Sequence, residues 1–254
     1  LVNTGYWASL RFKSMLESRS LQDKVVIAEG NIMPYLSGII GPAQVHIYNY
    51  KRILKVSTWP AHKKDEVYEV VKAVYPQFEL SENIIGCNFY PGNLSLHVQI
   101  VIPKAAFFFE RAREFKFYNE VSEPASKLAD AFDIERRNVV EAYGCETVGY
   151  VEWNRKANEH EGNNLLELYR GSEISKRWGK VAGIYRVIEE DICYSLVPLE
   201  GFAKTAGIET PLTTAMIDLL QVITGESYRE RSLTLQKLGL ENMSKNEIIE
   251  FINQ

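Results

Sequence analysis

Short runs of β-branched and aromatic residues alternate with a helical pattern in the first third of the chain. Strands are predicted at residues 25–29, 45–50 and 53–57, which are rich in Val, Ile and Tyr. A helix is predicted over 65–73, where the apolar positions recur at helical spacing. Between them, the glycines and proline of 38–42 indicate a turn. This order of elements predicts part of an α/β layer over residues 1–84.

Helix signals dominate from about residue 85 onward. A long helix is predicted over 123–143, and another begins at Thr210-Pro211, an N-cap residue followed by a proline in the first turn. Ser244 and Glu247 have the spacing of a capping box, which predicts a last helix. The polar cluster at 158–164 is typical of a loop. Residues 85–254 are therefore predicted to form an all-helical domain.

Composition narrows the class of protein. The 254 residues are 46% hydrophobic and 24% charged, as in a soluble globular protein, and the net charge of -4 with scattered basic residues argues against a nucleic-acid partner. No apolar run approaches the roughly 20 residues of a membrane helix. The three cysteines lack CxxC spacing and the other histidines lack ligand spacing, so we expect a reducing cytoplasm and no metal site.

His97 is the first candidate for chemistry. It lies in a run whose apolar and polar residues alternate as in a strand, and periodicity alone leaves strand and helix open. In a helix, Asn93 and His97 would share a face, so that the amide could steady the imidazole or contact the same ligand. A lone histidine among aliphatic residues is by itself more often structural.

Arg186 and Asp191 are the second candidates. A carboxylate that orients an imidazole and a guanidinium that holds an anionic substrate suit reduction of a carbonyl or imine next to a carboxylate. Alone, Asp191 after Glu189-Glu190 is more typical of a solvated face, and Arg186 of a surface cation. Five residues turn a helix by roughly 140°, so the two side chains would not share a helix face. They could still converge from opposite edges of one cavity.

The stretch 185–198, Tyr-Arg-Val-Ile-Glu-Glu-Asp-Ile-Cys-Tyr-Ser-Leu-Val-Pro, resembles a conserved motif of the octopine/nopaline (opine) dehydrogenases. Further similarity lies in 206–211, in Phe132-Asp-Ile-Glu-Arg136 and in the N-x-x-x-H pattern that ends at His97. The resemblance covers nearly the whole chain. It implies the C-terminal portion of a Rossmann-type nucleotide-binding domain (1–84), followed by an all-helical opine dehydrogenase domain (85–254) that resembles the 6-phosphogluconate dehydrogenase C-terminal fold.

The resemblance also implies a reaction. Members of this family condense an amino acid with a 2-oxo acid such as pyruvate, and reduce the imine with NADH or NADPH to an opine-type secondary amine dicarboxylate. They are oxidoreductases that act on CH–NH donors. By position, His97 matches the catalytic histidine and Asp191 its carboxylate partner. Arg186 matches the arginine that binds the oxo-acid carboxylate, and Asn93 the asparagine of the histidine motif.

Cofactor-binding residues are not identified, because the chain has no G-x-G-x-x-G loop and the family's first βαβ units precede it. The start without Met indicates a chain that begins within the nucleotide-binding domain, and we expect it to bind NAD(P) poorly by itself. Two alternatives stay open: a non-catalytic helical module that needs a separate nucleotide-binding part, and a two-domain hydroxy-acid dehydrogenase. The expected partners are the two small substrates, without nucleic acid or membrane, and a second copy of the chain in a homodimer.

Overall fold

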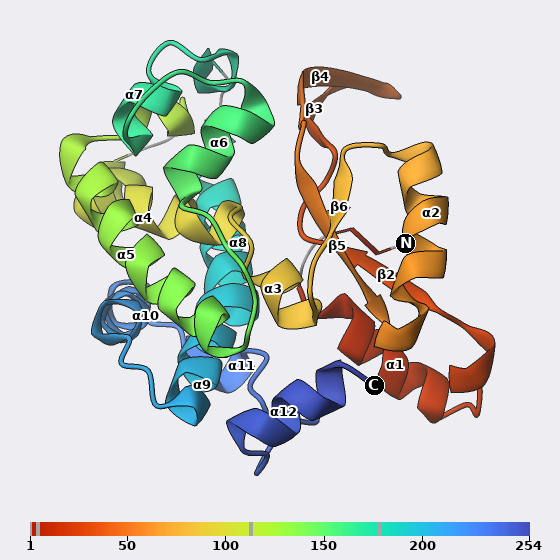
Figure 1. Cartoon of the computed structure of the whole chain (residues 1–254). Coiled ribbons are helices and arrows are strands. Elements are labelled where there is room, and N and C mark those ends of the chain that lie inside the picture. Colours follow the sequence, from red (N-terminus) through yellow and green to blue (C-terminus); the bar gives the residue numbers. More distant parts are fainter. Residues whose placement is uncertain (1, 4–5, 112–113, 177–178) are drawn as a thin grey trace.

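The computed structural model describes the chain except residues 1, 4–5, 112–113 and 177–178, and the side chains of 2–3, 111 and 179–182. An α/β part and a helical part lie side by side in Figure 1. The α/β part is formed by the N-terminal third of the chain and the helical part by the rest. This mixed architecture agrees with the predicted fold class.

The α/β part contains a four-stranded sheet of order β1-β2-β5-β6. Its β1–β2 and β5–β6 pairs are parallel, whereas β2 and β5 run antiparallel. The elements of this part are β1 (Val2–Asn3), α1 (Ala8–Glu17), β2 (Ile27–Gly30), β3 (Tyr35–Gly41), β4 (Gln44–Tyr50), β5 (Leu54–Trp59), α2 (Lys64–Val74) and β6 (Phe78–Leu80). The predicted helix and the three predicted strands are confirmed, with no end shifted by more than two residues.

The sheet buries different side chains against α1 and α2. Leu54 and Val56 pack with Val71 of α2, and Ile27 packs in a second cluster with Leu10 of α1. The β3–β4 hairpin stands apart from this sheet (Figure 1). Residues 38–41, which were predicted as a turn, belong to strand β3 instead, and only the two residues after Gly41 connect the strands. Gly38, Ile39 and Gly41 pair with residues of β4, which explains the difference.

The helical part contains the helices predicted over 123–143, after Thr210 and after Ser244, together with others that were not predicted individually. Its helices are α3 (Ile84–Asn88), α4 (His97–Val101), α5 (Glu123–Ala142), α6 (Tyr150–Asn158), α7 (Leu165–Tyr169), α8 (Val181–Asp191), α9 (Val197–Ala206), α10 (Pro211–Thr224), α11 (Tyr228–Arg231) and α12 (Lys245–Ile252). The capping box of Ser244 and Glu247 is confirmed. The short antiparallel pair of β7 (Glu114–Phe115) and β8 (Gly179–Lys180) interrupts the predicted all-helical part.

A five-residue π-helix, Ile192–Leu196, joins α8 to α9. Pro198, at the start of α9, has no N–H to donate to the carbonyl of Tyr194 four residues earlier. The indole Nε1–H of Trp7 donates to that carbonyl instead, over 3.2 Å. The Trp7 ring also stacks on Phe202 of α9, with ring centres 4.9 Å apart. A residue of the α/β part thus completes the helix geometry next to Asp191.

The two parts share one hydrophobic core. Its buried members include Trp7, Ile27 and Trp59 from the α/β part as well as residues of α5, α8, α9 and α12. At the C-terminus, Phe251 of α12 contacts the Trp59 ring, and the Gln254 carbonyl accepts from the backbone N–H of Ala61 at 2.8 Å. The predicted boundary between residues 84 and 85 stays a prediction, because this core continues across it.

Arg136 of α5 is fully buried and lies in a network of short hydrogen bonds. Its Nε donates to Asp133 at 2.8 Å, and its Nη atoms donate to the carbonyls of Phe89 at 2.8 Å and Val148 at 2.6 Å. The guanidinium therefore ties α5 to the segment after α3 and to the loop before α6. A buried charge of this kind is tolerated because every partner is satisfied.

We expect Arg136→Met to lower the free energy of unfolding by about 3–5 kcal/mol, since it leaves the buried Asp133 carboxylate without its main counter-charge. Urea unfolding followed by circular dichroism measures the change. The control is Lys127→Met on the same helix, whose ammonium is exposed and pairs with Glu123. Its unfolding midpoint should match that of the wild type, and an equal shift in both variants would contradict a specific role for Arg136.

Candidate active site

His97 and Asp191 meet in the interior of the helical part. His97 begins α4, Asp191 ends α8, and only 7% and 1% of their surfaces are exposed. The imidazole Nδ1 lies 3.0 Å from Asp191 Oδ2. Residues 94 positions apart in the sequence are thereby brought into the pairing that the resemblance implied, although their catalytic roles stay a prediction.

The environment of Asp191 determines what this pair can do. Burial raises the pKa of the Asp191 carboxyl, and the neighbouring His97 ring opposes that rise. As a carboxylate, Asp191 accepts the Nδ1–H of His97, which selects the tautomer with its lone pair on Nε2. Nε2 is then the atom of the ring that can exchange a proton with a ligand.

Aromatic side chains surround the free edge of the imidazole. His97 Nε2 lies 3.5 Å from the hydroxyl of Tyr118, and Phe117 contacts the ring edge-on with ring centres 5.6 Å apart. Tyr118 in turn stacks on Tyr169 of α7, at 5.2 Å. Tyr118 was missed by the sequence analysis, because Phe117-Tyr118 reads as a core pair and nothing in its spacing relates it to His97.

Asn93 lies in a short 3₁₀ segment, Asn93–Ser95, just before α4. The region is helical and not a strand, but Leu96 departs from helical dihedrals, so Asn93 and His97 do not lie on one regular helix. The Asn93 amide interacts with the hydroxyl of Tyr6. Burial, and then the charges of Asp191 and Glu190, raise the pKa of Tyr6. Tyr6 is thus a second site residue that the sequence analysis missed.

Arg186 is not directed toward His97. Its side chain is 66% exposed and its Nη1 donates to Glu190 of the same helix at 2.7 Å. Asp191 is buried on another side of α8, as the five-residue separation predicted. In this conformation the guanidinium is paired with Glu190 at the surface, and its role toward a substrate carboxylate stays a prediction.

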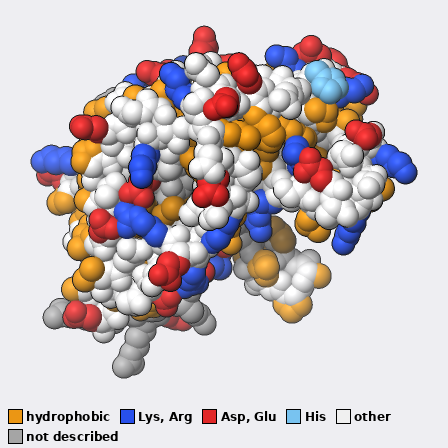
Figure 2. Space-filling model, turned by 90° about the horizontal axis from the view of Figure 1, so that it is seen from below, with side chains coloured by type: hydrophobic (Ala, Val, Ile, Leu, Met, Phe, Trp, Pro, Cys, Tyr) orange, Lys and Arg blue, Asp and Glu red, His pale blue; other side chains and the backbone are white. Residues whose placement is uncertain are grey.

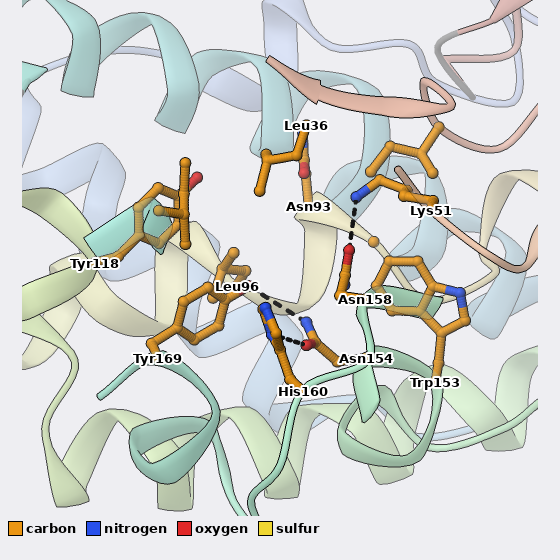
Figure 3. A pocket seen from close by; sticks show the side chains of 13 residues that line it. Leu36, Lys51, Asn93, Leu96, Tyr118, Trp153, Asn154, Asn158, His160 and Tyr169 are labelled. Atoms are coloured by element: carbon orange, nitrogen blue, oxygen red, sulfur yellow. Dashed lines mark hydrogen bonds between the residues drawn. The ribbon is translucent and has the colours of Figure 1, made fainter. Parts of the chain in front are cut away.

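A pocket lies between the two parts of the chain, next to Tyr118 (Figure 3). Asn93 and Tyr118 line its side near the histidine. The rest of its lining includes Lys51, Trp153, Asn154, Asn158, His160 and Tyr169. Its cavity volume is about 40 Å³. The cluster at 158–164 was predicted only as a polar loop, yet Asn158 ends α6 and contributes to this lining together with His160.

The carboxyl ends of the parallel strands β1 and β2 are both followed by residues that contact the segment 91–93. Tyr6 follows β1 and interacts with Asn93, while Asn31 follows β2 and its Nδ2 donates to the Pro91 carbonyl at 3.5 Å. In open α/β sheets, ligands bind beyond the carboxyl ends of the strands. By this rule, a ligand is expected between these strands and the segment that carries Asn93.

The described part of the chain contains no group of three His, Cys, Asp or Glu side chains that could hold a metal ion. Figure 2 shows the underside of the molecule, where Lys and Arg side chains are interspersed with Asp and Glu instead of forming a basic patch. Within the described ranges, no helix combines the length and the apolar character needed to cross a bilayer.

Comparisons with known proteins agree on one family. The profile described as "NAD/NADP octopine/nopaline dehydrogenase, alpha-helical domain" matches residues 80–224. An opine dehydrogenase of Arthrobacter sp. (strain 1C) is 26% identical over 241 residues, which are 93% of this chain and 66% of that protein. The chain thus spans about two thirds of the length of this relative.

Solved structures show the same fold. Octopine dehydrogenase with NADH and L-arginine superposes with a TM-score of 0.72 at 14% identity, over 97% of this chain and 69% of that one. Yersinopine dehydrogenase with NADP+ bound superposes with a TM-score of 0.67 at 13% identity, over 100% of this chain and 71% of that one. The predicted combination of a Rossmann-type part with a helical domain is confirmed at the level of fold.

Proposed function

Because the chain belongs to the octopine/nopaline dehydrogenase family, we propose that the protein condenses an amino acid with a 2-oxo acid such as pyruvate and reduces the imine with NADH or NADPH. The product is an opine-type secondary amine dicarboxylate, and the enzyme acts on CH–NH donors. The observation that carries this proposal is the buried hydrogen bond between His97 Nδ1 and Asp191, which leaves Nε2 beside Tyr118, a residue that lines the pocket.

Each site residue has a distinct part in this mechanism. The amino group of one substrate attacks the carbonyl carbon of the other, and the carbinolamine must lose its hydroxyl as water. Protonated His97 donates from Nε2 to that hydroxyl as the C–O bond breaks, and Asp191 stabilises the imidazolium through Nδ1. NADH or NADPH, when bound, supplies the hydride that reduces the imine carbon. Asn93 offers amide hydrogens to a substrate oxygen at the same end of the pocket.

Arg186 is proposed to bind the oxo-acid carboxylate after exchanging its Glu190 partner for the substrate. An exposed ion pair contributes little to stability, so a substrate carboxylate can replace it at small cost. The planar guanidinium suits two parallel hydrogen bonds to a carboxylate, which lysine cannot form.

We expect Arg186→Ala to raise KM for the oxo acid about tenfold or more, because a charge-assisted pair is lost. Arg186→Lys should recover only part of the loss. Steady-state kinetics with the oxo acid as variable substrate measures both. Glu190→Gln is the matched control, since it removes the competing partner and should leave KM unchanged or lower it. An unchanged KM in Arg186→Ala would remove Arg186 from the site.

The proposed reaction itself is tested by NAD(P)H oxidation with pyruvate and a panel of amino acids, using the full-length enzyme. The expected result is oxidation that requires an amine, with a secondary amine product identified by mass spectrometry. Oxidation without an amine would indicate a hydroxy-acid dehydrogenase instead. No oxidation with any pair would favour a non-catalytic module.

A further inference from the structure

Lys51 follows β4 and is buried in the wall of the pocket, with 6% of its surface exposed. Its Nζ donates to Asn158 Oδ1 at 3.4 Å and lies 5.6 Å from the centre of the Trp153 ring. Its neighbours behave differently, because Arg52 pairs with Glu159 and Lys55 with Glu79. Among the described residues, no carboxylate lies within ion-pair distance of Lys51 Nζ.

A buried ammonium without a counter-charge is costly, and proteins seldom retain one without a partner. The ammonium has three N–H groups, and in the interior they meet one amide oxygen and one aromatic face, fewer partners than water would provide. Burial accordingly lowers the pKa of Lys51 to about 8. Near neutral pH the group is still mostly charged, so the pocket contains a positive charge in need of an anion.

The rest of the pocket does not provide that anion. Asp and Glu are absent from its lining, as far as the described residues go. His160 Nδ1 lies 2.9 Å from Asn154 Oδ1, an atom that can only accept, so this nitrogen carries a hydrogen. Burial and the charge of Lys51 lower the pKa of His160, which keeps the imidazole neutral. Lys51 is therefore the cation of this pocket within the described part of the chain.

Lys51 lies across the pocket from Tyr118, the residue that contacts His97. Figure 3 shows Lys51 and Tyr118 on opposite sides of the pocket, with Asn93 between them. Tyr118 contacts His97 Nε2. A substrate whose reacting atoms lie beside His97 would thus extend toward Lys51 with the remainder of the molecule.

We propose that Lys51 binds a carboxylate of the amino acid substrate, assisted by Asn158 and with Trp153 as the wall that excludes water. This inference rests on the proposed function and adds a residue that recognises the second substrate. Arg186 and Lys51 would then hold the two carboxylates of the product from different elements. Either the α-carboxylate or a side-chain carboxylate of the amino acid meets this description, and the two are separated by experiment.

The test is isothermal titration calorimetry of the full-length enzyme with NADH or NADPH and without oxo acid, so that no turnover is needed. The probes are L-glutamate, L-glutamine and 4-aminobutanoate. In Lys51→Met we expect affinity to fall about tenfold or more, as for loss of a charge-assisted bond. If the side-chain carboxylate is bound, glutamate and 4-aminobutanoate weaken and glutamine does not. If the α-carboxylate is bound, glutamate and glutamine weaken and 4-aminobutanoate does not.

Two further variants serve as controls for this test. Lys55→Met on the neighbouring strand removes a lysine that pairs with Glu79 outside the pocket, and it should leave all three affinities unchanged. Asn158→Asp introduces a carboxylate beside Lys51, and it should compete with the ligand and weaken binding even if Lys51→Met does not fold.

The proposal is overturned if the wild type binds none of the probes, or if Lys51→Met and Asn158→Asp both bind them as the wild type does. Binding that depends on Lys51 without amine-dependent oxidation would overturn the proposed function and leave this site intact. The proposed function and the Lys51 site can therefore be refuted independently of each other.

Discussion

Replacement of His97 by alanine is expected to lower kcat by about 10²–10⁴-fold, the range typical of removing a positioned acid or base. His97 Nε2 lies next to Tyr118 in the pocket wall, and water cannot take a fixed position between Asp191 and the substrate as the imidazole does. KM for both substrates should change little, because the binding groups lie on other elements. Stopped-flow measurement of a single turnover separates the chemical step from product release.

Circular dichroism and the melting temperature check the fold of this variant, because it removes a buried hydrogen bond to Asp191 and ring contacts with Phe117 and Tyr118. A matched control is Gln99→Leu on the same helix, whose side chain donates to the Leu94 carbonyl away from the pocket. It tests whether any disturbance of α4 lowers the rate. Equal losses in the two variants, or full activity in His97→Ala, would contradict the assignment of His97 as the proton donor.

Asp191→Asn is expected to lower kcat by about 10²-fold or more with nearly unchanged geometry. The amide can present a hydrogen to Nδ1 and so favour the wrong tautomer of His97, and it offers no negative charge to the imidazolium. Because burial raises the pKa of Asp191, the replacement removes no well-solvated charge and should not destabilise the fold. The rate of NAD(P)H oxidation and the melting temperature measure the two effects.

The double variant gives the sharper result. If Asp191 acts only through His97, then Asp191→Asn should cost nothing further in a His97→Ala background, as for residues that act as a unit. Additive losses would instead assign Asp191 a separate contact with substrate.

The elements with strong periodicity could be predicted from the sequence. The helix from Glu123 and the capping box at Ser244 are local features, since the residues that define them are also the residues that interact. Strand β3 was missed because its glycines are typical of a turn, and its own composition does not reveal its pairing with the adjacent strand β4. Propensity carries no information about such a partner.

Only the site residues that belong to a family motif could be identified from the sequence. His97, Asn93, Arg186 and Asp191 were identified by resemblance, and the structure brings the first and last of these together. Tyr6, Tyr118 and Lys51 have no motif and reach the site through the packing of the two parts. A buried lysine also reads as a surface residue in any sequence analysis, because burial is a property of the tertiary structure.

The contact between Trp7 and the α8–α9 junction has a consequence for how the molecule denatures. Its indole fills the hydrogen-bonding position that Pro198 leaves vacant, and at the other end of the chain α12 returns to Trp59. Unfolding of either part would remove hydrogen bonds and core contacts from the other. Heating should therefore produce one calorimetric transition, and tryptophan fluorescence and ellipticity should change at the same temperature.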